Sequence, residues 1–181
     1  MQFLPTKIPD VILVEVPKFS DHRGFFMEIY QAKKFNDSGI TAKFVQDNLV
    51  SSQKNTLRGL HYQLKFPQGK LIRCIQGEIL DIAVDIRKSS STFGEWVGEI
   101  LSSENARQLY IPPGFAHGYT VYSEYAEVEY KCTELHHPED DCGILWNDPE
   151  IGIEWGVEHP ILSKKDKQQP LLKDVKEKLF K

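Results

Sequence analysis

The sequence predicts an all-β protein, either a sandwich or a barrel. Turn residues recur at short intervals along the 181-residue chain, and the segments between them alternate in polarity or consist of β-branched and aromatic residues. Helical periodicity is sparse, and aromatic side chains account for 11% of the chain, which favours a core that is sheet-rich or contains a pocket. At roughly 150 residues per domain, this length predicts one domain over residues 1–181.

A strand is expected wherever such a segment lies between two turns. In chain order, the expected strands cover residues 11–16, 24–30, 44–52, 57–63, 70–76, 78–86, 96–102, 108–111, 117–122 and 125–133. A short helix is expected over residues 31–37, where Gly39 would end it. A second helix is expected in a C-terminal tail from about residue 171, because apolar residues recur there at helical spacing. These residues are Leu171, Leu172, Val175 and Leu179.

Alternation within two strands predicts which side chains face the core. In residues 125–133, Tyr130 shares a face with apolar residues, so its ring is expected inside, where its hydroxyl needs a partner. Gln76-Gly77 is expected to form a hairpin turn between two neighbouring strands. In residues 78–86, four apolar residues share one face, which predicts that this face is the buried one. They are Leu80, Ile82, Val84 and Ile86.

The charge balance and the cysteine content exclude several classes of protein. Lys and Arg number 22 and Asp and Glu number 26, which gives a net charge of −4 and argues against a nucleic-acid-binding protein. The three cysteines, Cys74, Cys132 and Cys142, form no Cys-x-x-Cys pair, as is typical of a reducing compartment. No signal peptide or membrane-spanning segment is recognised, so a cytoplasmic protein without a membrane partner is expected.

Three cationic or titratable side chains gather in a short span: Arg58, His61 and Lys70. Burying them is costly without a partner, so an anionic ligand is expected there. Strict alternation puts His61 and Gln63 on one face of the strand and Arg58 on the other. Arg58 therefore joins His61 only if Gly59 marks a β-bulge.

A second cluster has the spacing Pro-x-Gly-x-x-His, in Ile111-Pro112-Pro113-Gly114-Phe115-Ala116-His117-Gly118. It resembles the second conserved element of cupins, which are double-stranded β-helix jelly rolls. Metal-binding cupins supply two more imidazoles from a His-x-His motif, where this chain has His61-Tyr62-Gln63. A metal enzyme that uses His61, Gln63 and His117 is an alternative, but the second imidazole is missing, and no metal is expected.

Two further clusters mix charges or amides with aromatic residues. They are Ser20-Asp21-His22-Arg23-Gly24-Phe25-Phe26-Met27-Glu28 and Phe44-Val45-Gln46-Asp47-Asn48. In the second, Gln46 and Asn48 share a face of the expected strand and can bind a polar ligand together.

Taken together, these motifs resemble the dTDP-4-dehydrorhamnose 3,5-epimerases, cupin-type enzymes of dTDP-L-rhamnose synthesis. The resemblance extends over nearly the whole chain. The matching motifs are Asp21-His22-Arg23-Gly24-Phe25-Phe26, Phe44-Val45-Gln46-Asp47-Asn48, Leu57-Arg58-Gly59-Leu60-His61-Tyr62-Gln63, Gly77-Glu78-Ile79, Val84-Asp85-Ile86-Arg87, Ile111-Pro112-Pro113-Gly114-Phe115-Ala116-His117-Gly118, Tyr130-Lys131, Trp146-Asn147-Asp148-Pro149 and Leu162-Ser163-Lys164-Lys165-Asp166.

The resemblance implies a cupin-like double-stranded β-helix jelly roll with short peripheral helices. It implies a homodimer in which N-terminal strands are exchanged between subunits and help to build the site. It also implies a nucleotide-sugar substrate, no cofactor, and a product that supplies the synthesis of cell-surface polysaccharide. The absence of a Gly-rich dinucleotide fingerprint agrees with the expectation that no redox cofactor is used.

The resemblance also implies roles for individual residues. A histidine matching His61 removes a proton beside the sugar ketone and pairs with an aspartate matching Asp166. A tyrosine matching Tyr130 is the acid on the opposite face of the ring, and a lysine matching Lys70 lies near the ketone oxygen. The other matching residues bind the nucleotide sugar: Arg23, Glu28, Gln46, Asn48, Arg58, His117, Asp141 and Lys165. These residue types suit enolate chemistry, which needs a base, a group that stabilises the oxyanion, and a second proton donor.

One position departs from the family. A tyrosine often stacks on the thymine, and the matching position here is His136. Imidazole stacks less broadly, so the preference for thymine is the least determined part of the resemblance. Two further alternatives stay open: a sibling enzyme that epimerises one carbon or moves the ketone, and a non-catalytic sugar-binding jelly roll.

Overall fold

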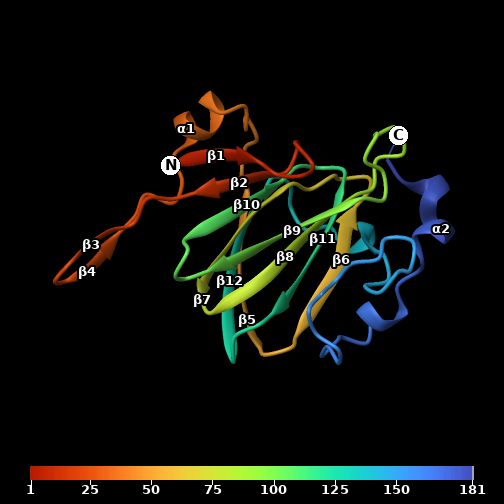
Figure 1. Ribbon diagram of the computed structural model, residues 1–181. Coiled ribbons are helices and arrows are strands. Elements are labelled where there is room, and N and C mark those ends of the chain that lie inside the picture. The colour runs from red at the N-terminus through yellow and green to blue at the C-terminus, as the bar shows by residue number, and fades with distance from the viewer. Residues whose placement is uncertain (181) are drawn as a thin grey trace.

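Two antiparallel sheets face each other in the computed structural model, which describes residues 1–180 (Figure 1). In spatial order, the six-stranded sheet contains β1 (Gln2–Pro5), β2 (Ile12–Glu15), β10 (Arg107–Ile111), β7 (Lys70–Gln76), β12 (Tyr125–Cys132) and β5 (Gln46–Gln53). The five-stranded sheet contains β13 (Asp141–Gly143), β6 (Leu57–Gln63), β11 (Phe115–Val121), β8 (Glu78–Asp85) and β9 (Trp96–Ser102). This sandwich confirms the predicted all-β jelly roll.

The main core lies between the two sheets. Inward-facing side chains of both sheets form one buried cluster there, to which β8 contributes Ile79 and Ala83. The opposite face of β8 is also buried, because the C-terminal part of the chain covers it: Ile82 and Val84 belong to a second cluster that includes Trp155. The predicted burial of the face that carries Ile82, Val84 and Ile86 is confirmed, but the opposite face, which was not expected in the core, is buried as well. Apolar alternation misses the inner face because it also carries the fully buried Asp81 and Asp85.

The outer face of the six-stranded sheet is partly covered by helix α1 (Ala32–Asp37). Phe35 of this helix is buried against Val14 and Tyr110, together with neighbouring apolar residues. The helix ends before Gly39, whose φ of +93° suits a helix C-terminus. The predicted helix over residues 31–37 is confirmed.

A small hairpin of β3 (Phe19–Asp21) and β4 (Gly24–Phe26) projects away from the sandwich (Figure 1). Its aromatic side chains are largely exposed: Phe19 by 64%, Phe25 by 57% and Phe26 by 70%. The strand predicted over residues 24–30 is correct only to Phe26. Met27 and Tyr30 then pack in the cluster around α1.

Three other sequence predictions need correction. The Gln76-Gly77 turn does not join a hairpin, because β7 and β8 belong to different sheets. The C-terminal helix α2 covers only Leu172–Val175 and continues as a 3-10 turn over Lys176–Lys178. Strands β1, β3 and β13 were not predicted, since four, three and three residues are too few for an alternating pattern to be recognised. No helix within residues 1–180 is long and apolar enough to cross a membrane.

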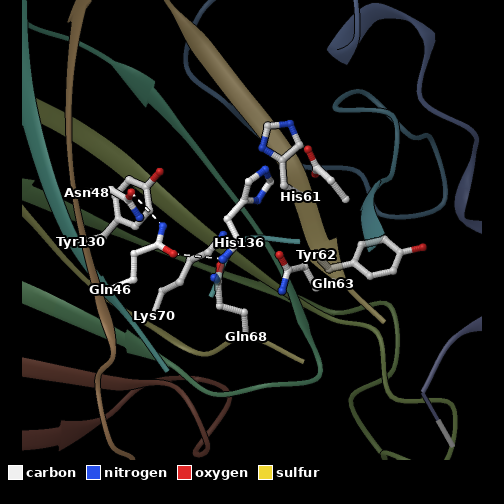
Figure 2. A pocket seen from close by; sticks show the side chains of 10 residues that line it. Gln46, Asn48, His61, Tyr62, Gln63, Gln68, Lys70, Tyr130 and His136 are labelled. Carbon is white, nitrogen blue, oxygen red and sulfur yellow. Dashed lines mark hydrogen bonds between the residues drawn. The ribbon is translucent and has the colours of Figure 1, made fainter. Parts of the chain in front are cut away.

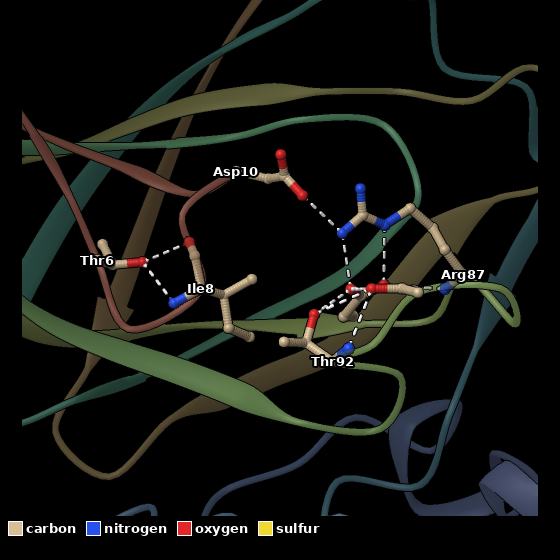
Figure 3. A network of polar contacts seen from close by, with 7 residues as sticks. Thr6, Ile8, Asp10, Arg87 and Thr92 are labelled. Carbon is tan, nitrogen blue, oxygen red and sulfur yellow. Dashed lines mark hydrogen bonds and ion pairs between the residues drawn. The ribbon is translucent and has the colours of Figure 1, made fainter.

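A polar network ties the β1–β2 connection to the end of β8 (Figure 3). The carboxylate of Asp85 is fully buried and accepts hydrogen bonds from Arg87, Ser90 and Thr92. Arg87 also donates to Asp10 at 2.8 Å. Burial acts to raise the pKa of Asp85, but the hydrogen bonds outweigh it and lower the pKa to about 2.

Candidate active site

Three adjacent cavities open between β5 and β6, which follow each other in the chain but lie in different sheets. The outer chamber, of about 280 Å³, is lined by Gln46, Asn48, His61, Tyr62, Gln63, Gln68, Lys70, Tyr130, His136 and Asp141 (Figure 2). The inner chamber, of about 170 Å³, is lined by Val50, Arg58, His61, Lys70, His117, Tyr119 and Tyr130. The side pocket, of about 610 Å³, shares Arg58 with the inner chamber and is also lined by Ser51, Ser52, Gln53, Thr56, Leu57, Tyr125, Ile161, Leu162, Ser163 and Asp166.

His61 and Asp166 form a hydrogen-bonded pair. His61 Nε2 lies 2.6 Å from Asp166 Oδ1, at the start of the 3-10 turn over Asp166–Gln168. The aspartate side chain is 4% exposed and that of His61 is 32% exposed. Burial acts to raise the pKa of Asp166, but the hydrogen bond with His61 outweighs it, so the pKa lies below its usual value and the carboxylate stays charged. A charged carboxylate on one ring nitrogen holds the imidazole in a fixed orientation.

Tyr130 and Lys70 come from the other sheet and line both chambers. Tyr130 points inward with the apolar side chains of β12, as predicted. Burial raises the pKa of Tyr130 to about 12, so its hydroxyl keeps its proton near neutral pH. Burial also lowers the pKa of Lys70, whose Nζ lies 5.9 Å from the centre of the Tyr130 ring. Figure 2 shows Tyr130 and His61 on different sides of the cavity.

Arg58 reaches the inner chamber because the ladder between β6 and β11 shifts register beside Gly59. Gly59 has a φ of +132°, and a Cβ there would lie only 2.6 Å from Gly118 Cα. The bulge required to bring Arg58 and His61 together is therefore present. In the same chamber, His117 Nε2 lies 2.8 Å from Asp81 Oδ1, and burial lowers the pKa of His117.

Amide side chains organise the rim of the outer chamber. Gln46 donates to Asn48 Oδ1 at 3.0 Å and accepts from the His136 backbone N–H at 3.0 Å. Gln63 donates to the carbonyl oxygens of Phe66 and Leu135 and accepts from the His137 N–H. Gln63 therefore ties two loops together.

The metal alternative finds no support in this geometry. The amide of Gln63 is fully engaged with backbone groups, and the Nε2 atoms of His61 and His117 each face a carboxylate. In the part of the chain that the structure describes, no three His, Cys, Asp or Glu side chains are grouped so that they could hold a metal ion.

Not all predicted site residues meet at this cavity. Asp141 lines the outer chamber and forms an ion pair with Lys165. Arg23 lies at the tip of the projecting β3–β4 hairpin, where it pairs with Asp21 at 2.6 Å, and Glu28 pairs with Lys34. Neither Arg23 nor Glu28 lines any of these three cavities.

Several residues that line the cavities were not among the predicted site residues, and Gln68, Tyr119 and Ser52 are three of them. Gln68 donates to the Glu134 carbonyl oxygen at 2.6 Å, and its place after a turn proline gave no signal of that contact. Tyr119 follows His117 at the two-residue period of β11, so alternation could have placed it in the same chamber. Ser52 is buried near the end of β5, and a single serine in a strand gives no functional signal in the sequence.

Comparisons with known proteins agree with one another. A family model described as dTDP-4-dehydrorhamnose 3,5-epimerase matches residues 5–174. Among curated relatives with this name, the Shigella flexneri protein is 54% identical over 168 residues, which cover 92% of this chain and 93% of the relative. The Pseudomonas aeruginosa protein is 53% identical over 170 residues, covering 93% of this chain and 94% of the relative.

A similar solved structure is that of dTDP-6-deoxy-D-glucose-3,5-epimerase from Legionella pneumophila, in complex with dTDP-4-keto-L-rhamnose. It superposes with a TM-score of 0.96 at 47% identity, and the match covers 99% of this chain and 96% of that one.

Proposed function

The chain belongs to the dTDP-4-dehydrorhamnose 3,5-epimerase family and is an isomerase, and we propose that His61 and Tyr130 carry its two proton transfers. The enzyme epimerises carbons 3 and 5 of dTDP-4-dehydro-6-deoxy-D-glucose and forms dTDP-4-dehydro-L-rhamnose. The observation that carries the assignment is that a base and an acid from two different sheets face the same pair of chambers.

His61 removes the proton from the carbon beside the ketone. The charged Asp166 orients the imidazole and stabilises the imidazolium that forms. Lys70 faces the ketone oxygen, where its ammonium group stabilises the enolate as charge develops. Because Tyr130 remains protonated near neutral pH, it can return a proton to the opposite face of the ring, which inverts the carbon.

The nucleotide part of the substrate is held by side chains that line the two chambers. Arg58 offers a guanidinium group, which matches the geometry of a diphosphate, and Gln46 and Asn48 offer amides. His136 stands where its ring can stack on the base. His117, together with the Asp141–Lys165 ion pair, completes the set of proposed sugar-nucleotide contacts.

Arg23 and Glu28 serve the site of a second subunit in a homodimer. Three observations support this proposal: the β3–β4 hairpin projects from the sandwich, its aromatic residues are exposed, and its Arg23 is remote from the cavity of its own subunit. Exposed aromatic patches of this kind are usually covered by a partner. The three cysteines carry free thiols, which suits the proposed cytoplasmic location, where the product would supply cell-surface polysaccharide synthesis.

Product analysis tests the reaction directly. NMR of dTDP-4-dehydro-6-deoxy-D-glucose in deuterated water should show deuterium at carbons 3 and 5 and inversion of both centres. Inversion at only one carbon would indicate a sibling epimerase, and exchange at neither carbon would indicate a binding protein.

A mixing experiment tests the shared site. Arg23→Ala and His61→Ala proteins are combined after reversible subunit dissociation and assayed at substrate well below the wild-type KM, where each variant alone is impaired. In a mixed dimer, one site receives an intact hairpin and an intact His61, so random mixing should restore about a quarter of the wild-type sites. Activity that stays at the sum of the two parents would show that each hairpin serves its own subunit.

A further inference from the structure

The hydroxyl of Tyr119 is a buried polar group that the proposed chemistry leaves unused. Tyr119 is 3% exposed and packs in the core between the sheets, and its ring lines the inner chamber beside Tyr130. Among the side chains of residues 1–180, its hydroxyl is one of few buried polar atoms without a hydrogen-bond partner. A buried hydroxyl without a partner costs free energy, so an unpaired one beside a cavity is a candidate partner for water or a ligand that enters the cavity.

Tyr119 shares the inner chamber with Tyr130 and neighbours Ser52 and Arg58, which line the side pocket. Burial raises the pKa of Tyr119, while the Ser52 hydroxyl and the Arg58 guanidinium beside it act to lower this pKa. Arg58 Nε donates to Ser52 Oγ at 3.2 Å. Ser52 and Arg58 both line the side pocket, and Arg58 also lines the inner chamber. Polar groups thus extend from Tyr130, past Tyr119, to a second opening that is separate from the outer chamber.

The reaction creates a need for such a route. Each inversion leaves His61 with an extra proton and Tyr130 without one, and two carbons are inverted. Before the second inversion, His61 must lose its extra proton and Tyr130 must regain one, while the bound sugar occupies the chambers. Asp166, the partner of His61, also lines the side pocket, so the proton that His61 gained can leave on the same side.

We propose that Tyr119 is a positioning residue that returns a proton to Tyr130 between the two inversions, taking it from water in the side pocket by way of Ser52. The proposal rests on the role proposed above for Tyr130. Only protons move: the Tyr119 hydroxyl gives its proton, through water of the inner chamber, to the Tyr130 phenolate and regains one from the side pocket. No bond to carbon is made or broken in this step, and no electron is transferred.

Single-turnover kinetics of Tyr119→Phe test the proposal. This variant keeps the ring and deletes the hydroxyl. Enzyme in excess is mixed with substrate, and the sugars are reduced with borohydride at set times and separated. We expect the first inversion at the wild-type rate and the second slowed on the order of 10²-fold, so that singly inverted sugar accumulates. Ser52→Ala should slow the second inversion in the same way but less, because water can replace the serine hydroxyl.

Tyr110→Phe is the matched control, since Tyr110 is a buried tyrosine on the outer side of the six-stranded sheet. It should behave as the wild type. Equal slowing of both inversions by Tyr119→Phe, or a raised KM with unchanged kcat, would assign the hydroxyl to the fold or to the sugar and overturn the proposal. Wild-type progress curves for Tyr119→Phe would overturn it too. If wild type and Tyr110→Phe also fail to invert either carbon, the proposed function itself is wrong.

Discussion

The chambers between the sheets and the β3–β4 hairpin are built in opposite ways. In the chambers, each proposed catalytic side chain is anchored by a neighbour from another element: His61 by Asp166, and Tyr130 by the packed core. On the hairpin, Arg23 is 79% exposed and its ion-pair partner Asp21 lies only two residues away. Proton-transfer groups must be held to within fractions of an ångström, whereas a group that captures a phosphate can be positioned when the substrate or a partner arrives.

Because of this difference, substitutions in the two regions should impair the enzyme in two different ways. Changes in the chambers should reduce kcat, because they alter interactions that matter most in the transition state, and changes on the hairpin should raise KM. Three variants test that separation and a pair of aspartates extends the contrast to stability, in order of decreasing expected effect.

His61→Ala should have the largest effect. Without the base, product formation and deuterium exchange at carbons 3 and 5 should both fall by roughly 10²–10⁴-fold. The measurement is NMR in deuterated water, with dTDP binding as the control for an intact nucleotide site. Exchange at the wild-type rate would remove His61 from the role of base.

Tyr130→Phe should separate exchange from inversion. The ring stays in its place and only the hydroxyl is lost, so His61 can still form the enolate and return the proton to the original face. Deuterium should enter the substrate while inverted product is strongly reduced, most clearly at carbon 5. Loss of all exchange, or normal product, would contradict the assignment of base and acid to opposite faces.

Arg23→Ala should raise KM by roughly tenfold and leave kcat within about twofold, as expected for the loss of one charge-assisted contact to phosphate. Lys33→Ala provides a control, because Lys33 is an equally exposed cation on α1. Steady-state kinetics measure both constants. A fall in kcat at unchanged KM would place Arg23 in the chemistry and break the proposed division between the two regions.

Two aspartates extend the comparison to stability. The pKa of buried Asp85 is about 2 in the folded protein and near 3.9 when unfolded, so its stabilisation is present above about pH 4 and is lost as the pH falls toward 2. Asp85→Asn should lower the free energy of unfolding at pH 7 by about 2 kcal/mol and flatten its pH dependence in that range. Asp21→Asn, on the exposed hairpin, should leave the stability unchanged. Denaturant unfolding at fixed protein concentration checks both, and equal effects would contradict the difference in burial.

The sequence predicts the regular part of the fold better than its irregular parts. Strands 57–63, 70–76 and 96–102 have the predicted bounds, and alternation placed Tyr130 inside, because period-two patterns report directly on a sheet with one buried face. The same rule failed for β8, where charged residues lie on a buried inner face and find partners that are distant in sequence, such as His117 for Asp81.

Contacts between distant segments explain most of what was missed in the site. The clamp formed by Gln63 joins loops that lie about 70 residues apart, and no local pattern encodes it. The sequence does indicate that a bulge at Gly59 is needed to bring Arg58 and His61 to one face, since an odd number of positions separates them along the strand. The missing hydrogen-bond partner of the Tyr119 hydroxyl can be recognised only in the three-dimensional structure.

The placement of His61 and Tyr130 on two facing sheets has a consequence for how the activity can diversify. Handedness at the reacting carbon is set by the layer from which each proton comes, and strand order fixes those layers. Point substitutions around the chambers can change which carbon is presented, how long an intermediate stays, or which sugar fits. The loss of one hydroxyl on β12 is enough to make the proton return on the same face. To place the base on the acid's side and the acid on the base's side, the strand order would have to change. The faces on which the base and the acid stand should therefore vary far less among proteins with this topology than substrate choice does.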